Sequence, residues 1–215
     1  MTSTPYRILI IIVAAVSAIS AGCASAPPAS SPAAGLHETP PGLGRLPYSD
    51  ADVDFMSGMI PHHAQAVIMA GWAPTHGARQ DVAVLCERIV VGQRDEIALM
   101  QTWLRDRGLP VPDATSTRHK MKMNGMEHEM LMPGMLTDEE MAALDRARGP
   151  EFDRLFLIGM IRHHQGAVDM VDTLFKSFGA AQDEVVFKFA NDVYADQSTE
   201  ITRMTQMLEG GGRLH

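Results

Sequence analysis

Apolar residues recur at intervals of three and four along most of the chain beyond residue 50. Ile89, Ile97, Met100 and Leu104 follow this spacing, with Gln93 in the same register. This period is that of a helix with one buried face, and we identify no segment with the strict alternation that predicts a half-buried strand. The pattern therefore predicts an all-α protein.

Helix-ending residues divide this region into long helices and one short helix. Pro74 and Gly77 end the first long helix, and Gly108 and Pro110 end the second. Pro61 lies inside the first helix and predicts a kink or a restart there. The predicted long helices span 50–73, 79–107, 151–177 and 181–209, and the short one spans 138–148.

The chain contains an internal repeat. Gly58-Met59-Ile60 recurs as Gly159-Met160-Ile161, and His62-His63 recurs as His163-His164. A second block, from Gln93 to Leu104, recurs in the last predicted helix. Two blocks in the same order indicate a duplicated helical hairpin. Because neither hairpin can bury its apolar stripe alone, their packing predicts a four-helix bundle with approximate two-fold symmetry.

The start of the chain has the pattern of an export signal. Residues 8–22 are uncharged, end in small side chains just before Cys23, and are too short to span a bilayer comfortably. They resemble a bacterial lipobox, with Ser20 where Leu is usual, and predict lipid attachment at Cys23. A soluble secreted form and an uncleaved anchor are the alternatives. All three place the folded part outside the cytoplasm, either on the bacterial cell membrane or secreted.

A tether separates this signal from the folded domain. Residues 24–47 are rich in Pro, Ser and Gly and poor in bulky apolar residues, so they cannot form a core. Ser49, followed by Asp52, has the pattern that begins a helix. The predicted organisation is a signal peptide 1–22, a lipid-anchored tether 23–48 and a bundle 49–209, made of a first hairpin 49–107, a Met-rich connector 108–150 and a second hairpin 151–209.

Composition narrows the possible functions. The 215 residues include 18 Lys and Arg against 26 Asp and Glu, and the net charge of −8 argues against a nucleic-acid partner. The 2 cysteines exclude a disulfide framework, and we expect Cys86 to be a small buried apolar residue. The unusual feature is methionine, with 16 residues against 7 Phe, 3 Tyr and 2 Trp.

The duplicated histidine pairs carry the candidate chemistry. In each repeat a methionine lies one helical turn before two adjacent histidines, on the face expected to be buried. Neutral imidazole and thioether together favour Cu(I), or its mimic Ag(I), over Mg, Ca or Mn. One ring of each pair could point inward and the other toward the bundle edge. The candidate ligands are Met59, His62, His63, Met160, His163 and His164.

Neighbouring polar residues have two interpretations. Glu96 and Glu200, or Gln93 and Gln197, could accept the second ring N–H of a histidine ligand. They could equally be hydrogen-bonded polar groups of the bundle. Four further methionines at inward positions are more simply explained as core residues; they are Met69, Met100, Met170 and Met204.

The connector holds six methionines within residues 121–135, where Gly, Asn and Pro interrupt any helix. Thioethers on a flexible loop, with His119 nearby, could wrap around a soft ion. Alternatively, these methionines pack over the open end of the bundle as a lid, and a lid over the histidine face could itself be the site. The candidate ligands in the connector are Met121, Met123, Met126, His128 and Met130.

The strings DFMSGMIPHHAQAVIMA and FDRLFLIGMIRHHQGAVDMV, each followed by a Q-x-x-E-I-x-x-M segment, resemble the family catalogued as domain of unknown function 305. The resemblance covers about residues 49–209. It implies a ferritin-like four-helix bundle that is commonly exported or lipid-anchored in bacteria, with some members linked to copper binding and tolerance. Carried over by position, it implicates the same Met and His residues of the two repeats.

These observations predict a non-enzymatic, extracytoplasmic copper-binding lipoprotein that sequesters Cu(I) or hands it to a protein partner, contributing to copper homeostasis or tolerance. Its expected partners are the metal ion and, through the lipid anchor, the membrane. One alternative is a ferritin-like di-metal oxidase or peroxidase, although no Glu stands three residues before any of the paired histidines. The other is a helical interaction or sensor module without metal, whose Met-rich surface binds a protein.

Overall fold

The structure is a computed structural model that describes residues 36–37, 47–123 and 126–211. The predicted signal peptide and Cys23 lie outside these residues. The helices are α1 (Asp50–Gly71), α2 (Ala73–His76), α3 (Gln80–Arg105), α4 (Asp138–Arg146), α5 (Pro150–Lys176) and α6 (Glu184–Gly211). The strands are β1 (Leu36–His37), β2 (Tyr48–Ser49), β3 (His119–Met123) and β4 (Met126–Met130).

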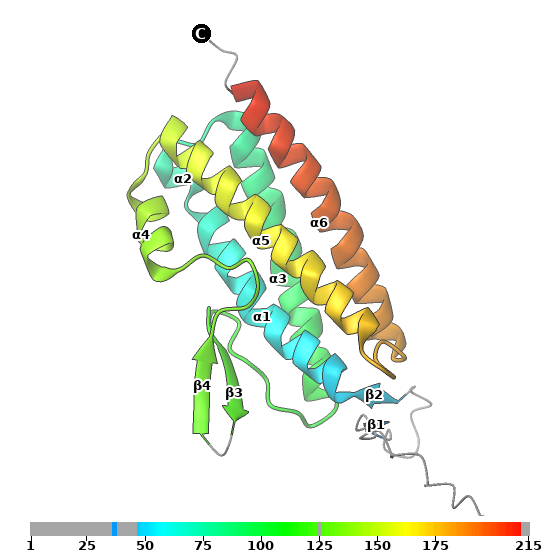
Figure 1. The fold of residues 1–215 in the computed structure, drawn as a ribbon. Helices are drawn as coiled ribbons and strands as arrows, with labels where there is room; N and C mark the ends of the chain where they lie inside the picture. The colour runs from blue at the N-terminus through cyan, green and yellow to red at the C-terminus, as the bar shows by residue number, and fades with distance from the viewer. Residues whose placement is uncertain (1–35, 38–46, 124–125, 212–215) are drawn as a thin grey trace, which may run out of the picture. The chain divides into compact units, whose positions relative to one another are not determined.

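The four long helices form a bundle of two hairpins, as the repeat predicted. Helix α1 packs along α3, α5 packs along α6, and the hairpins meet along α1 and α5 (Figure 1). The helix boundaries fall within three residues of those predicted. The predicted restart at Pro61 is wrong, because α1 is one helix from Asp50 to Gly71 with Pro61 inside it. None of the described helices is long and apolar enough to cross a membrane.

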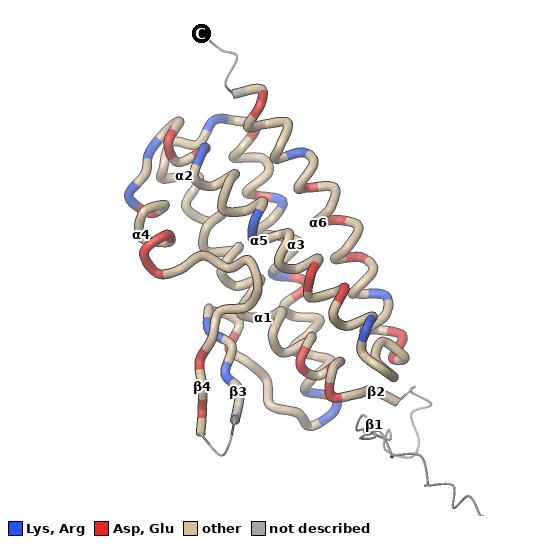
Figure 2. The backbone as a smooth tube through the Cα atoms, in the orientation of Figure 1, with Lys and Arg blue, Asp and Glu red and all other residues tan. Residues whose placement is uncertain are grey.

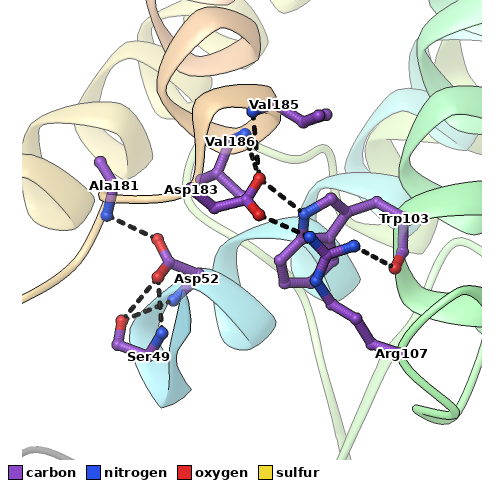
Figure 3. A network of polar contacts seen from close by, with 8 residues as sticks. All are labelled: Ser49, Asp52, Trp103, Arg107, Ala181, Asp183, Val185 and Val186. Atoms are coloured by element: carbon purple, nitrogen blue, oxygen red, sulfur yellow. Dashed lines mark hydrogen bonds and ion pairs between the residues drawn. The ribbon is translucent and has the colours of Figure 1, made fainter. Parts of the chain in front are cut away.

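The first helix begins at a capping box that also joins the two hairpins. Ser49 accepts a hydrogen bond from the Asp52 backbone N–H, and Asp52 accepts from the Ser49 backbone N–H and hydroxyl. The other carboxylate oxygen of Asp52 accepts from the backbone N–H of Ala181 at 2.7 Å, in the turn between α5 and α6 (Figure 3). Asp52 therefore caps its own helix and fastens the opposite hairpin.

The second repeat uses its equivalent aspartate in the same way. Asp153 in α5 accepts from the backbone N–H of Arg79, which immediately precedes α3, with both oxygens at 3.3 Å. A third aspartate, Asp183, accepts from Trp103 Nε1 at 3.0 Å and pairs with Arg107, and so links the start of α6 to the end of α3 (Figure 3). The repeated aspartates are thus explained by the packing of the two hairpins.

Two equivalent glycines, Gly58 in α1 and Gly159 in α5, lie under side chains of the connector and of the opposite hairpin. A Cβ atom at Gly58 would lie 2.7 Å from the Met132 methyl carbon and 3.7 Å from that of Met170. At the equivalent Gly159, it would lie 3.4 Å from the Met69 methyl carbon. Met69 and Met170 are repeat equivalents, so each hairpin places one methionine over a glycine of the other. The shortest of these distances are to the connector, since a Cβ atom at Gly159 would also lie 3.2 Å from Leu136.

The connector crosses this interface and breaks its symmetry. Gln65 of α1 exchanges two hydrogen bonds with the backbone of Leu136, at 2.9 and 2.7 Å. Its repeat equivalent, Gly166 of α5, lies so close to the connector that a Cβ atom would be 1.9 Å from the Pro133 carbonyl oxygen. The first repeat therefore binds the connector through the Gln65 side chain. The second repeat has a glycine at the same position, which leaves space for the connector backbone.

The Met-rich segment is a β-hairpin, so the expectation of an irregular loop is wrong. Strands β3 and β4 pair antiparallel, with His119 opposite Met130 and Met121 opposite His128. Met and His alternate with Lys and Glu along both strands, and the sequence Asn124-Gly125 between them is the pair most typical of a two-residue hairpin. The pattern was overlooked because its alternating residues are Met and charged side chains instead of β-branched ones.

The core confirms the expectations for four methionines and for Cys86. Met69, Met100, Met170 and Met204 are buried, at 7% exposure or less. Cys86 is buried, and its burial, with the charge of Asp153, raises the pKa of the thiol to about 12. The thiol therefore stays protonated at neutral pH and behaves as an apolar residue.

Candidate metal centre

The four repeated histidines form one buried cluster between α1 and α5. Each of their side chains is completely buried, at 0% exposure. The rings of His62 and His163 lie at the centre, with their centroids 3.8 Å apart. His63 and His164 lie outside them, each with its ring centroid 6.2 Å from that of its sequence neighbour. The duplication thus brings both His-His pairs to a single place.

The two central rings donate hydrogen bonds to backbone carbonyls. His62 Nε2 lies 3.0 Å from the carbonyl oxygen of Pro133 in the connector. His163 Nε2 lies 3.0 Å from the carbonyl oxygen of His62 itself. The central pair is therefore oriented by the connector on one side and by α1 on the other.

The two outer rings donate hydrogen bonds to glutamates, which is one of the alternatives that the sequence left open. His63 Nε2 lies 2.7 Å from Glu96 of α3, and His164 Nε2 lies 2.7 Å from Glu200 of α6. The alternative acceptors, Gln93 and Gln197, do not take this role, and the Oε1 atoms of both are buried without a hydrogen-bond partner among the described atoms. The carboxylates occupy the outer-shell position that orients histidine ligands in metal sites.

These partners determine which nitrogen of each ring carries the proton. Carbonyl and carboxylate oxygens only accept hydrogen bonds, so in a neutral ring Nε2 holds the hydrogen and Nδ1 holds a lone pair. All four Nδ1 atoms are buried without a hydrogen-bond partner in the described part of the chain. Leaving a buried polar atom unpaired costs about 1 to 3 kcal/mol. The four Nδ1 lone pairs are therefore the atoms of this cluster that could bind a ligand.

Burial keeps the central rings neutral and so keeps their lone pairs free. Burial and the neighbouring His63 lower the pKa of His62 to about 3. Burial and the adjacent His62 lower the pKa of His163 well below its usual value. Neutral imidazole is the form that binds metal ions.

Met59 and Met160 are completely buried in the same helices, one turn before the histidines. Residues three and four apart on a helix are neighbours, so each thioether lies on the same helix face as the histidine rings that follow it. Among the described residues, no three His, Cys, Asp or Glu side chains already converge on one point. Imidazole and thioether are donors that Cu(I) and Ag(I) accept and that Mg and Ca do not favour.

The β3–β4 hairpin places the predicted connector ligands apart from this cluster. Antiparallel register puts positions 119, 121, 128 and 130 on one face, with Lys120 paired to Glu129 on the other. Met126, His128 and Met130 are exposed and Met121 is half-buried, whereas the side chain of Met123 lies outside the described set. The exposed hairpin residues do not pack over the bundle as the predicted lid, whereas two later methionines of the same segment do, because Met132 packs against the core and Met135 is buried. Pro133, just after the hairpin, reaches the cluster through its carbonyl group.

Sequence reasoning missed two contributors to the cluster. One is the Pro133 carbonyl, which no side-chain pattern can reveal. The other is the pair Gly134 and Gly166, which lets that carbonyl approach His62, since a Cβ atom at Gly134 would lie 2.9 Å from the Gly166 Cα atom. The available signal was the difference between the repeats, where Gln65 stands in place of glycine.

The depressed pKa of His62 predicts that the metal-free protein loses stability in acid. Between pH 6.5 and about 3, the unfolded chain binds a proton at His62 that the folded protein excludes, so the free energy of unfolding falls as pH falls. The slope reaches about 1.4 kcal/mol per pH unit for this one group. We expect a loss of about 2 kcal/mol between pH 6.5 and 5, measured by urea unfolding. The His62→Gln variant should lose less stability over the same pH range. A wild type that is equally stable at pH 6.5 and at pH 5 would contradict the burial argument.

Comparison with known proteins places this bundle in a family. The family described as "Domain of unknown function (DUF305)" matches residues 52–208. A viral relative, Uncharacterized protein L153 of Acanthamoeba polyphaga mimivirus, is 33% identical over 58 residues, which are 27% of this chain and 38% of the relative. The chain therefore matches well under two thirds of that relative.

Solved structures of similar fold include proteins with bound copper. A DUF305 protein from Streptomyces coelicolor that is named as secreted has 27% identity and a TM-score of 0.63, covering 75% of this chain and 94% of that one. The Cu(I)-bound form of CopM has 29% identity and a TM-score of 0.55, covering 74% of this chain and 96% of that one. Its Cu(II)-bound form has 32% identity and a TM-score of 0.58, with the same coverage.

Proposed function

This chain belongs to the DUF305 family, and from that premise we propose that it is an extracytoplasmic protein that binds Cu(I) with the histidines and methionines of its duplicated helices. The copper-bound structures of CopM support a copper-related role in the family. An export signal in the sequence, and the similar protein named as secreted, support a location outside the cytoplasm. A lipid on Cys23 would hold the protein at the membrane.

The observation that carries this proposal is the set of four buried Nδ1 atoms without partners. Their cost in the metal-free protein is offset if an ion binds the lone pairs. The proposed ligands come from this set together with the two thioethers, and the hydrogen bonds at Nε2 hold the rings in the required tautomer. The proposed ligands are His62, His63, His163, His164, Met59 and Met160.

The chemistry of this donor set favours Cu(I) over harder ions. Thioether sulfur and neutral imidazole are soft and borderline donors, and the carboxylates nearest the rings, Glu96 and Glu200, are engaged as hydrogen-bond acceptors. A thioether has no proton to lose and cannot form a disulfide, so it suits an oxidising compartment. Complete burial of the rings excludes solvent from the bound ion and favours sequestration, with release to a protein partner, over turnover of a substrate.

An anaerobic titration with Cu(I) against a competing chelator tests the proposal. We expect the purified protein to take copper from a chelator of at least micromolar affinity and to unfold at a higher temperature when loaded. Binding weaker than micromolar would overturn the proposal and leave the interaction module as the better explanation. Iron retained through purification, with turnover of peroxide, would instead favour the di-metal oxidase.

We also propose that the Met and His face of the β3–β4 hairpin is a second, weaker site that captures the ion from solution. Exposed donors bind an ion that must still be partly solvated, so this site should be weaker than the buried cluster and faster to exchange. Replacing Met121, Met126 and Met130 by Leu preserves volume and removes the sulfurs. We expect the Cu(I) stoichiometry to fall while the tight binding and the melting temperature stay unchanged. Unaltered stoichiometry would exclude a site on the hairpin.

A further inference from the structure

A groove of about 580 Å³ lies between α3 and α6, on the side of the bundle where the outer histidines meet their glutamates. Glu96 and Glu200, the acceptors for His63 and His164, both line it, and their side chains are 25% and 16% exposed. The histidine rings behind them are completely buried. One layer of carboxylates therefore separates the groove from the cluster.

The charge of this groove is predominantly negative. Its lining contains Glu87, Glu96, Asp196 and Glu200 against the single cation Arg88. Burial and the charges of Glu96 and Glu200 raise the pKa of Asp196, which indicates that the three carboxyl groups interact. Acidic positions recur along α6 in Figure 2. A cleft lined by one sign of charge concentrates ions of the opposite sign and accelerates their association.

Two buried amides in the same groove lack hydrogen-bond partners. Gln93 and Gln197 are repeat equivalents on α3 and α6, they are 5% and 4% exposed, and both line the groove. The Oε1 atom of each is buried and has no partner among the described atoms. Both oxygens are buried, so each can coordinate a cation in the groove once its amide side chain turns toward it. They provide an indication of a ligand that is independent of the acidic residues.

The opposite side of the cluster is closed mainly by backbone, although a smaller pocket of about 260 Å³, lined in part by Met132, Pro133 and Met170, lies along the connector there. There the connector lies against α5, with the Pro133 carbonyl group bonded to His62 and Gly134 in contact with Gly166. Opening that side would break backbone contacts. On the α3–α6 side, the contacts to the outer rings come from the side chains of Glu96 and Glu200, which can move without breaking backbone contacts.

We propose that the acidic groove between α3 and α6 is the entrance through which a monovalent soft cation reaches the histidine cluster, and that Glu96 and Glu200 position the outer rings at its inner end. This inference rests on the proposed function, because it assigns the route to that same site. The groove attracts the ion, the Gln93 and Gln197 oxygens replace part of its hydration shell, and the imidazole Nδ1 atoms then bind it. Release follows the same path in reverse.

The test separates the rate of entry from the affinity of the site. In the groove variant, Glu87→Gln and Asp196→Asn remove two charges without touching a histidine or its hydrogen-bond partner. The matched control, Glu139→Gln with Asp172→Asn, removes two exposed charges from α4 and α5 outside the groove. Association of Ag(I) with the full protein is followed anaerobically by stopped-flow tryptophan fluorescence, and equilibrium affinity is measured by chelator competition.

We expect roughly tenfold slower association for the groove variant at low ionic strength, because acidic clefts raise on-rates by factors of this order. The rate of the control should match that of the wild type, and the difference should disappear in about 0.5 M salt, where charges are screened within a few ångströms. Equal rates in all three proteins, or equal slowing in both variants, would overturn the entrance. A wild type that binds no Ag(I) or Cu(I) at equilibrium would instead refute the proposed function.

Discussion

Replacing all four cluster histidines by glutamine should weaken Cu(I) binding by more than about 100-fold, because it removes every proposed Nδ1 ligand, whereas loss of an outer-shell partner alone costs about 10- to 100-fold. Glutamine is chosen because its amide N–H can lie near the former Nε2–H. It can therefore keep the hydrogen bonds to the Pro133 carbonyl and to Glu96 and Glu200. The change removes the metal-binding lone pairs with little effect on packing. Anaerobic chelator competition measures the affinity, and circular dichroism verifies the fold.

His76 provides a matched control for this experiment. It is also buried and helical, but both of its ring nitrogens are engaged, Nδ1 with Thr75 at 2.9 Å and Nε2 with the Asp145 carbonyl oxygen at 2.8 Å. We expect His76→Gln to leave Cu(I) affinity unchanged. If the fourfold variant kept wild-type affinity while the hairpin Met→Leu variant lost it, the tight site would lie on the hairpin and our assignment would be wrong.

Gly166→Ala should destabilise the protein by about 3 kcal/mol, near the upper end for overpacking. Alanine normally favours a helix over glycine by about 1 kcal/mol. Here the added Cβ atom would lie 1.9 Å from the Pro133 carbonyl oxygen and 2.8 Å from the Gly134 Cα atom, and backbone atoms cannot rotate away. The steric term therefore exceeds the helical gain. For a chain of this size we expect the melting temperature to fall by roughly 6 to 12 °C.

Gly166→Ala should also lower the affinity of the proposed metal site. Moving the connector displaces the carbonyl group that accepts from His62 Nε2, so Cu(I) affinity should fall together with stability. Gly92→Ala is the matched control, because Gly92 lies inside α3 and a Cβ atom there meets nothing within 4 Å. That change should stabilise the protein by about 0.5 to 1 kcal/mol. Destabilisation of similar size in both variants would show that the contact with the connector is not the cause.

The fourfold His→Gln variant and Gly166→Ala test the same arrangement, the first at the histidines and the second at the connector that contacts them. The repeat supplies a symmetric frame, in which Asp52 and Asp153 each fasten the opposite hairpin. The connector occurs once, so it contacts the two repeats differently, through the Gln65 side chain in α1 and by close backbone approach at Gly166 in α5. The central histidines consequently have different acceptors, the Pro133 carbonyl for His62 and the His62 carbonyl for His163. We therefore expect the two halves of the cluster to contribute unequally to binding.

Much of the fold could be predicted from the sequence because its signals are local. Helix periodicity and the Ser49 cap depend on residues a few positions apart, and both were confirmed. The same holds for the burial of Met59, Met160 and the paired histidines, which follows from one amphipathic face. The β3–β4 hairpin was equally local and was missed only because alternating Met and charged residues did not match the expected strand composition.

By itself, the sequence determined the all-α class, the duplicated hairpin and the identity of the candidate ligands, since all three depend on periodicity and residue type. Only the tertiary structure decided which nitrogen of each ring is free, because the acceptors come from Pro133, Glu96 and Glu200, far from the histidines in sequence. The tertiary structure also shows that the hairpin residues are exposed while the cluster is buried, and that an acidic groove lies between α3 and α6. These features depend on how distant segments pack, and no local pattern encodes that packing.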